Sequence, residues 1–102
     1  MTRAFEFTTT QGEQFVIFLG EENGQIRWFG IRECNLPPRA TGKDAEKLPR
    51  YLFLVGSTLN ECKMLCQAVK DMEEGIAQGL SIEEASALSL MPVLEKLKKE
   101  GK

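Results

Sequence analysis

Residues 14–32 read QFVIFLGEENGQIRWFGIR, two apolar runs joined by the dipeptide Asn23-Gly24. Both central residues of a type I′ turn need positive φ, and Asn-Gly adopts it readily, so the stretch predicts a β-hairpin. A two-residue turn also fixes the pairing of the strands, because it sets Leu19 opposite Trp28. The hairpin therefore decides which side chains share a face of the sheet.

A further strand is predicted before the hairpin, over residues 3–8, with Gln11-Gly12 as the connecting turn. A two-residue turn there would set Phe7 opposite Val16. The three strands then sort into two faces. The first face is expected to lie under helices and comprises Phe5, Phe7, Val16, Phe18, Phe29 and Ile31. The second is apolar across its second and third strands and comprises Ala4, Glu6, Thr8, Phe15, Ile17, Leu19, Ile26 and Trp28.

A long connection follows, because residues 35–50 carry Pro37, Pro38, Gly42 and Pro49. Such connections are often functional or mobile. The next run, residues 51–55, is short, apolar and ended by a glycine, which predicts a buried fourth strand of unassigned position in the sheet.

The rest of the chain is predicted to be helical. Thr58 with Glu61 and Ser81 with Glu84 make two capping boxes. Apolar residues recur at three- and four-residue spacing after each, and Pro92 should end or bend the second helix. We therefore expect a single α+β domain over residues 1–102. An N-terminal antiparallel sheet of three to four strands (1–56, with the loop 35–50) packs with two or three C-terminal helices (57–102).

Composition narrows the classes of function. The 13 basic and 15 acidic residues give a net charge of -2, which supplies no general attraction for nucleic acid. No apolar run reaches the length of about 18 residues that a membrane span needs. The N-terminus carries no apolar signal core, and three cysteines are an odd number, so we expect a cytoplasmic protein with reduced thiols.

Catalysis has little support in the sequence. The chain lacks histidine, and its paired acids Glu21-Glu22, Glu73-Glu74 and Glu83-Glu84 stand where carboxylates are solvated or cap a helix. Cys62 and Cys66 fall on an apolar helical stripe and are expected to pack in the core. We expect no enzyme activity, no metal and no cofactor. An enzyme working through Cys34 or the corner at Ser57 is the remaining catalytic alternative.

The C-terminal quarter offers a second function. GLSIEEA (79–85) followed by VLEKLKKEG (93–101) resembles the two helices of a helix-turn-helix, although the turn lacks the usual glycine. The resemblance implies a DNA-binding regulator with Val93, Lys96 and Lys99 toward the major groove. The alternative interpretation is an amphipathic helix with a proline bend, docked on the surface of the domain.

The second sheet face is the predicted binding site. A contiguous apolar patch with a tryptophan is seldom left in water, so we expect a partner to cover it. The contact residues are Phe15, Ile17, Leu19, Ile26 and Trp28, with Arg27 and Arg32 at the rim. The chain is then a small cytosolic, non-catalytic binding or regulatory protein that forms a homodimer or acts as an inhibitor or adaptor of a protein partner. In the alternative, the chain's own helices bury both faces.

Overall fold

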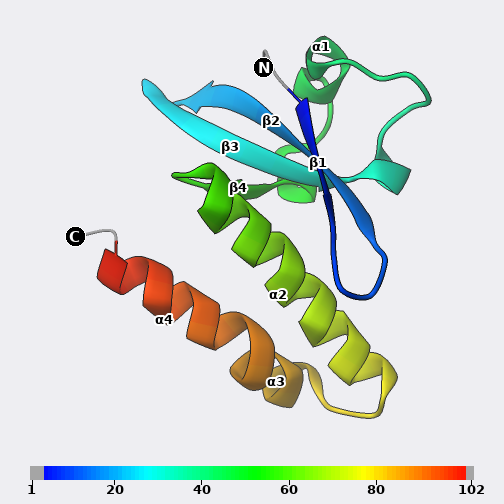
Figure 1. The fold of residues 1–102 in the computed structure, drawn as a ribbon, viewed down its shortest axis with the longest axis vertical. Coiled ribbons are helices and arrows are strands. Elements are labelled where there is room, and N and C mark those ends of the chain that lie inside the picture. Colours follow the sequence, from blue (N-terminus) through cyan, green and yellow to red (C-terminus); the bar gives the residue numbers. More distant parts are fainter. Residues whose placement is uncertain (1–3, 101–102) are drawn as a thin grey trace.

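The computed structural model describes residues 4–100 and shows an α+β fold, a four-stranded antiparallel sheet followed by helices (Figure 1). The predicted fold class is therefore confirmed. Neighbouring strands of the sheet follow chain order: β1 (Ala4–Thr8), β2 (Gln14–Glu22), β3 (Gln25–Arg32) and β4 (Leu54–Gly56). The α-helices are α1 (Gly42–Glu46), α2 (Leu59–Ala77), α3 (Ile82–Ala85) and α4 (Met91–Glu100).

The β2–β3 hairpin forms as predicted. Asn23 and Gly24 both have positive φ, 52° and 79°, and Glu22 pairs with Gln25 across the turn. Leu19 lies opposite Trp28 in consequence. The dipeptide thus fixes the register of the two strands, because few other residues accept this backbone conformation at two successive positions.

The predicted pairing of β1 with β2 is wrong by one residue. Phe7 lies opposite Phe15, and Phe5 lies opposite Ile17. The connection is longer than a two-residue turn, since Thr8 pairs with Gln14 and residues 9–13 form the loop. A slip of one residue moves every side chain to the other face. Phe5 and Phe7 therefore belong to the second face and not to the first.

The first face lies under the segment between β3 and β4, where the sequence predicted a connection without structure. This segment contains α1 and two 3-10 turns, Glu33–Asn35 and Arg50–Leu52. It contributes Ala45 and Phe53 to a cluster with the sheet residues Phe18, Phe29 and Ile31. The expectation that the C-terminal helices cover this face is wrong, because α1 and its flanking turns do so.

The fourth strand is shorter than predicted and lies beside β3. It spans Leu54–Gly56, whereas the sequence placed it over residues 51–55. Tyr51 lies in the preceding 3-10 turn and is 84% exposed. The apolar run is thus split between a turn and a strand, which its composition alone does not distinguish.

Helix α2 covers the second face. Thr58 and Glu61 form the predicted capping box at its start. Its stripe places Cys62 and Cys66 against Phe15 and Ile17, and all four are buried. The predicted packing role of both cysteines is confirmed. Both faces of the sheet are therefore covered within one chain.

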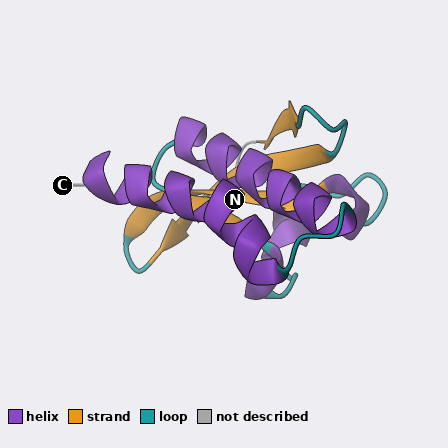
Figure 2. Cartoon of the chain, turned by 90° about the horizontal axis from the view of Figure 1, so that it is seen from below, coloured by secondary structure: helices purple, strands orange, loops and turns teal. Residues whose placement is uncertain are grey.

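The C-terminal segment is helical from Ile82 to Glu100, without a turn between two separate helices. Ser81 and Glu84 form the second predicted capping box. Just before Pro92 the helix widens into a π turn, Ser86–Leu90, in which the Met91 backbone N–H donates to the Ser86 carbonyl. Pro92 does not end the helix, and the helix-turn-helix arrangement is not formed. The segment packs beside α2 and runs antiparallel to it (Figures 1 and 2).

Candidate functional site

The structure does not bring the predicted contact residues together on a free surface. Phe15 and Ile17 are 1% and 0% exposed under α2. Leu19 and Trp28 are half-buried, and the Trp28 ring meets that of Phe5 edge to face, with 5.6 Å between centroids. Ile26 alone of the five apolar contacts is well exposed, at 62%. The prediction that this face needs an external partner is wrong, because α2 supplies the cover.

The two rim arginines have partners within the chain. Arg27 donates to the Ser57 hydroxyl and to Gln25. Arg32 pairs with Glu73 of α2, which raises the pKa of Arg32, and its guanidinium lies 5.8 Å from the centroid of the Phe15 ring. Both arginines therefore make contacts within the chain, and neither lies at the rim of an exposed apolar patch.

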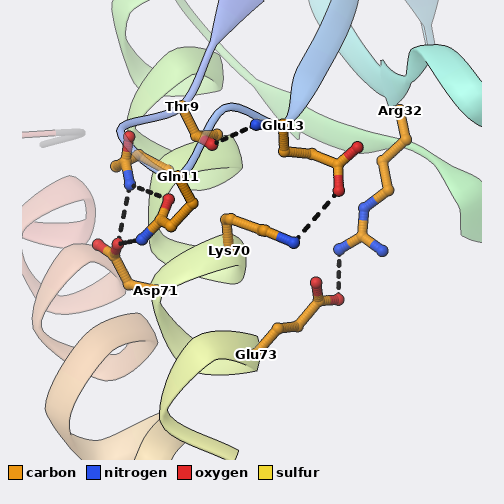
Figure 3. A network of polar contacts seen from close by, with 8 residues as sticks. Thr9, Gln11, Glu13, Arg32, Lys70, Asp71 and Glu73 are labelled. Atoms are coloured by element: carbon orange, nitrogen blue, oxygen red, sulfur yellow. Dashed lines mark hydrogen bonds and ion pairs between the residues drawn. The ribbon is translucent and has the colours of Figure 1, made fainter. Parts of the chain in front are cut away.

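A polar network joins the β1–β2 loop to α2 (Figure 3). Gln67 of α2 donates to Gln11 at 3.0 Å and to Asp71 at 2.8 Å, and it also accepts from the Thr10 backbone N–H at 3.0 Å. Lys70 pairs with Glu13 at 3.3 Å beside the Arg32–Glu73 pair. Among the described residues, no buried side-chain nitrogen or oxygen lacks a hydrogen-bond partner. We therefore interpret the network as a structural contact that holds the loop against the helix.

The three cysteines lie in different environments. Cys34 is exposed, whereas Cys62 and Cys66 are buried. The hydrogen bond with Cys66 and burial raise the pKa of the Cys62 thiol, which keeps it protonated and a poor nucleophile. Within residues 4–100, no three histidine, cysteine, aspartate or glutamate side chains are placed to hold a metal ion.

An open groove of about 380 Å³ lies at the outer end of the first face, between β1, β2 and residues 33–40. Arg39 stands at this groove with φ of 61°, an uncommon conformation for a residue other than glycine. The groove is lined by apolar side chains and by charges of both signs. The lining residues are Ala4, Glu6, Val16, Phe18, Glu33, Leu36, Pro37, Pro38, Arg39 and Ala40. No one kind of ligand is favoured by such a lining.

Several large apolar side chains are exposed along the C-terminal helical segment, residues 82–100. Leu88, Met91 and Leu94 are 71%, 46% and 42% exposed. The side of the segment turned toward α2 consists of Ala85, Ser86, Ser89, Leu90, Val93 and Leu97, all buried or half-buried. The opposite side, here called the outer face, is exposed throughout and consists of Glu84, Ala87, Leu88, Met91, Leu94, Glu95 and Lys98.

The members of the outer face recur at three- and four-residue spacing from Glu84 to Lys98, which is the spacing of a surface that meets another helix. The π turn Ser86–Leu90 lies in the first half of this stretch. Glu84 begins the face, and Lys98 closes it. The sequence interpretation missed it because leucine and methionine on both sides of a helix do not show which side faces the domain. The paired spacings 84, 88, 91, 95 and 87, 91, 94, 98 were the available signal.

None of the helices described within residues 4–100 combines the length and the apolar character needed to cross a bilayer. Comparison of the chain with protein-family models, with curated proteins and with solved structures finds no match.

Proposed function

We propose that the chain is a small non-catalytic binding protein that acts by contact with a protein chain through the outer face of its C-terminal helix. The exposure of Leu88, Met91 and Leu94 along one helix face carries this proposal. Each side chain costs free energy in water, about 25 cal/mol for every Å² of apolar surface, and a partner would remove that cost. The proposed role is that of an accessory protein, an inhibitor or an adaptor.

Two further observations support a binding role over a catalytic one. The chain contains no histidine, and its two buried thiols serve packing between α2 and the sheet. The three free cysteines are compatible with a reducing compartment such as the cytosol.

The proposal is tested by substituting the centre of the outer face. A tagged chain and its Met91→Glu variant are co-expressed with the untagged chain and used to retain proteins from a native extract. Ile26→Glu is the matched control, because Ile26 is an exposed apolar residue of β3, beside the Asn23-Gly24 turn and outside the C-terminal helix. We expect a protein, either the untagged chain or another, to be retained by the wild type and by Ile26→Glu and lost with Met91→Glu. Equal retention by all three would refute the proposal.

A further inference from the structure

The outer face is symmetric about Met91 in sequence position, with the π turn Ser86–Leu90 on its N-terminal side and the α-helix Met91–Glu100 on its C-terminal side. Leu88 and Leu94 lie three residues to either side of it, Ala87 and Glu95 four residues, and Glu84 and Lys98 seven residues. If two such helices pack antiparallel with a two-fold axis at Met91, each member of the face meets its counterpart on the other copy. A two-fold interface uses the same patch on both chains and requires this self-complementarity.

The charges on the segment match the same arrangement. Glu83 and Glu84 are exposed at its start, and Lys98 and Lys99 are exposed at its end. Antiparallel packing brings the two carboxylates of one copy opposite the two ammonium groups of the other. Parallel packing would instead set like charges side by side, which is unfavourable. The Ser81 backbone N–H donates to Glu84 at 3.0 Å and lowers the pKa of its carboxyl, so this carboxylate is ionised at neutral pH.

The apolar contacts fall at the centre. Leu88 of one copy meets Leu94 of the other, and Met91 meets Met91. The charged pairs then lie at both ends, and Glu95 of one copy lies opposite Ala87 of the other, between the apolar centre and these pairs. An apolar core with a polar rim is the usual anatomy of an interface. Methionine adapts its shape readily to its neighbours, which suits a position that must pack against itself.

We infer that the partner of the outer face is a second copy of the same chain, packed antiparallel along residues 83–99 with the two-fold axis at Met91. This inference rests on the proposed function, because it names the partner of the same face.

Charge reversal provides the test. The double variants Glu83→Lys/Glu84→Lys and Lys98→Glu/Lys99→Glu each set like charges opposite one another in a homodimer. When they are mixed, every pair across the interface is again opposite in sign. We expect sedimentation equilibrium to give the wild type a concentration-dependent mass rising toward twice 11.5 kDa, each double variant the monomer mass, and the mixture a restored dimer. Lys43→Glu/Lys47→Glu, which changes one exposed charge in α1 and one just after it, should behave as the wild type.

A second measurement does not depend on the capping residue Glu84. Met91→Cys in a Cys34→Ser background places one exposed thiol on the proposed axis, since Cys62 and Cys66 are buried. Oxidised glutathione should link this variant into a covalent dimer, and Ile26→Cys in the same background should stay unlinked. A wild type that is monomeric at every concentration, or double variants that self-associate as the wild type does, would overturn the inference.

The result also separates the inference from the proposed function. Suppose that the wild type is a monomer, and that it retains a protein other than itself which Met91→Glu does not retain. The proposed function then stands, and the second copy is ruled out as partner. If the monomer instead binds anionic phospholipid vesicles and Met91→Glu does not, both the inference and the proposed function fail.

Discussion

Gly30 of β3 lies directly against Cys62 of α2: a β-carbon on Gly30 would stand 2.9 Å from the Cys62 sulfur. The sulfur of Cys66 would be equally close, at 2.9 Å. Carbon and sulfur atoms do not approach so near without displacement, so the missing side chain lets the helix settle onto the sheet. Small residues on both sides of this contact set the spacing between the two layers.

Gly30→Ala is therefore expected to destabilise the fold by about 1–3 kcal/mol through overpacking. Because the obstructing atoms are side-chain sulfurs, the cost should shrink when both cysteines are replaced by alanine. Urea denaturation of the wild type, Gly30→Ala, Cys62→Ala/Cys66→Ala and the triple variant measures this coupling. Strictly additive costs would contradict the contact.

Gly56→Ala supplies the matched comparison. Its β-carbon would stand 2.7 Å from the backbone nitrogen of Cys62, which truncating the cysteine side chain does not remove. The cost of Gly56→Ala should therefore be unchanged in the Cys62→Ala/Cys66→Ala background. Rescue there would show that the side chain, and not the helix backbone, is what the new methyl group meets.

Thiol labelling should distinguish the three cysteines. Cys34 is exposed, whereas the Cys62 sulfur donates to the Leu54 carbonyl at 3.4 Å within the core. The raised pKa of Cys62 leaves little thiolate near neutral pH. Mass spectrometry after brief exposure of the native protein to a thiol reagent should show one label per chain, and three labels after unfolding. A second label on the folded protein would be inconsistent with this packing.

Gln67→Ala should weaken the contact between the β1–β2 loop and α2. The side chain bonds to Thr10, Gln11 and Asp71, and its removal leaves partly buried polar groups without their partner. A loss of about 1–3 kcal/mol in the free energy of unfolding is expected. Lys63→Ala, on the same helix, takes part in none of these bonds and should cost less than about 0.5 kcal/mol. Equal losses for both variants would argue against the network.

Asp44 should make the stability of the fold depend on acid pH. The Thr41 backbone N–H donates to its carboxylate at 2.7 Å and lowers the pKa of Asp44 below the ordinary value of 3.8. The folded state therefore holds this proton less tightly than the unfolded state. The stabilisation is complete above pH 3.8 and is lost as the pH falls through the lower pKa of the folded state.

Melting temperatures of the wild type and Asp44→Asn measure this effect. The difference between them should be constant near neutral pH and should narrow below about pH 4, because the variant cannot ionise there. Glu21→Gln removes one exposed carboxylate from the β2–β3 hairpin and controls for net charge. A difference that stays constant down to pH 2 would count against the capping interaction.

The sequence predicts the elements whose signals are local. Asn23-Gly24 sets the register of β2 with β3, and the capping boxes at Thr58 and Ser81 mark where two helices start. Each signal acts within a few residues, so no knowledge of the rest of the chain is needed.

The register of β1 depends on the loop. Thr9 donates to the Glu13 carbonyl at 2.9 Å and makes the connection five residues long, which Gln11-Gly12 alone does not reveal. Five loop residues instead of the predicted two shift the pairing by an odd number of residues, and such a shift moves Phe5 and Phe7 to the other face of the sheet. The unknown length of one loop thus changes which residues pack on each face of the sheet.

The candidate site could not be predicted, because it depends on which element covers which surface. An apolar sheet face around Trp28 is compatible with a partner or with a helix of the same chain. The assignment requires the position of α2, and that position follows from contacts such as Gly30 with Cys62 that join distant parts of the sequence. Once α2 takes the sheet, the surplus of apolar side chains falls on the last helix instead.

The order of the strands, with each one beside its neighbour along the chain, has a consequence for folding kinetics. Short loops connect the strands of the β1–β2 and β2–β3 hairpins and connect α2 to α3. Bringing together two segments joined by a short loop costs little chain entropy. Domains built in this way fold faster than those that must first join remote segments, typically within milliseconds. We therefore expect a stopped-flow refolding trace with a single fast exponential phase.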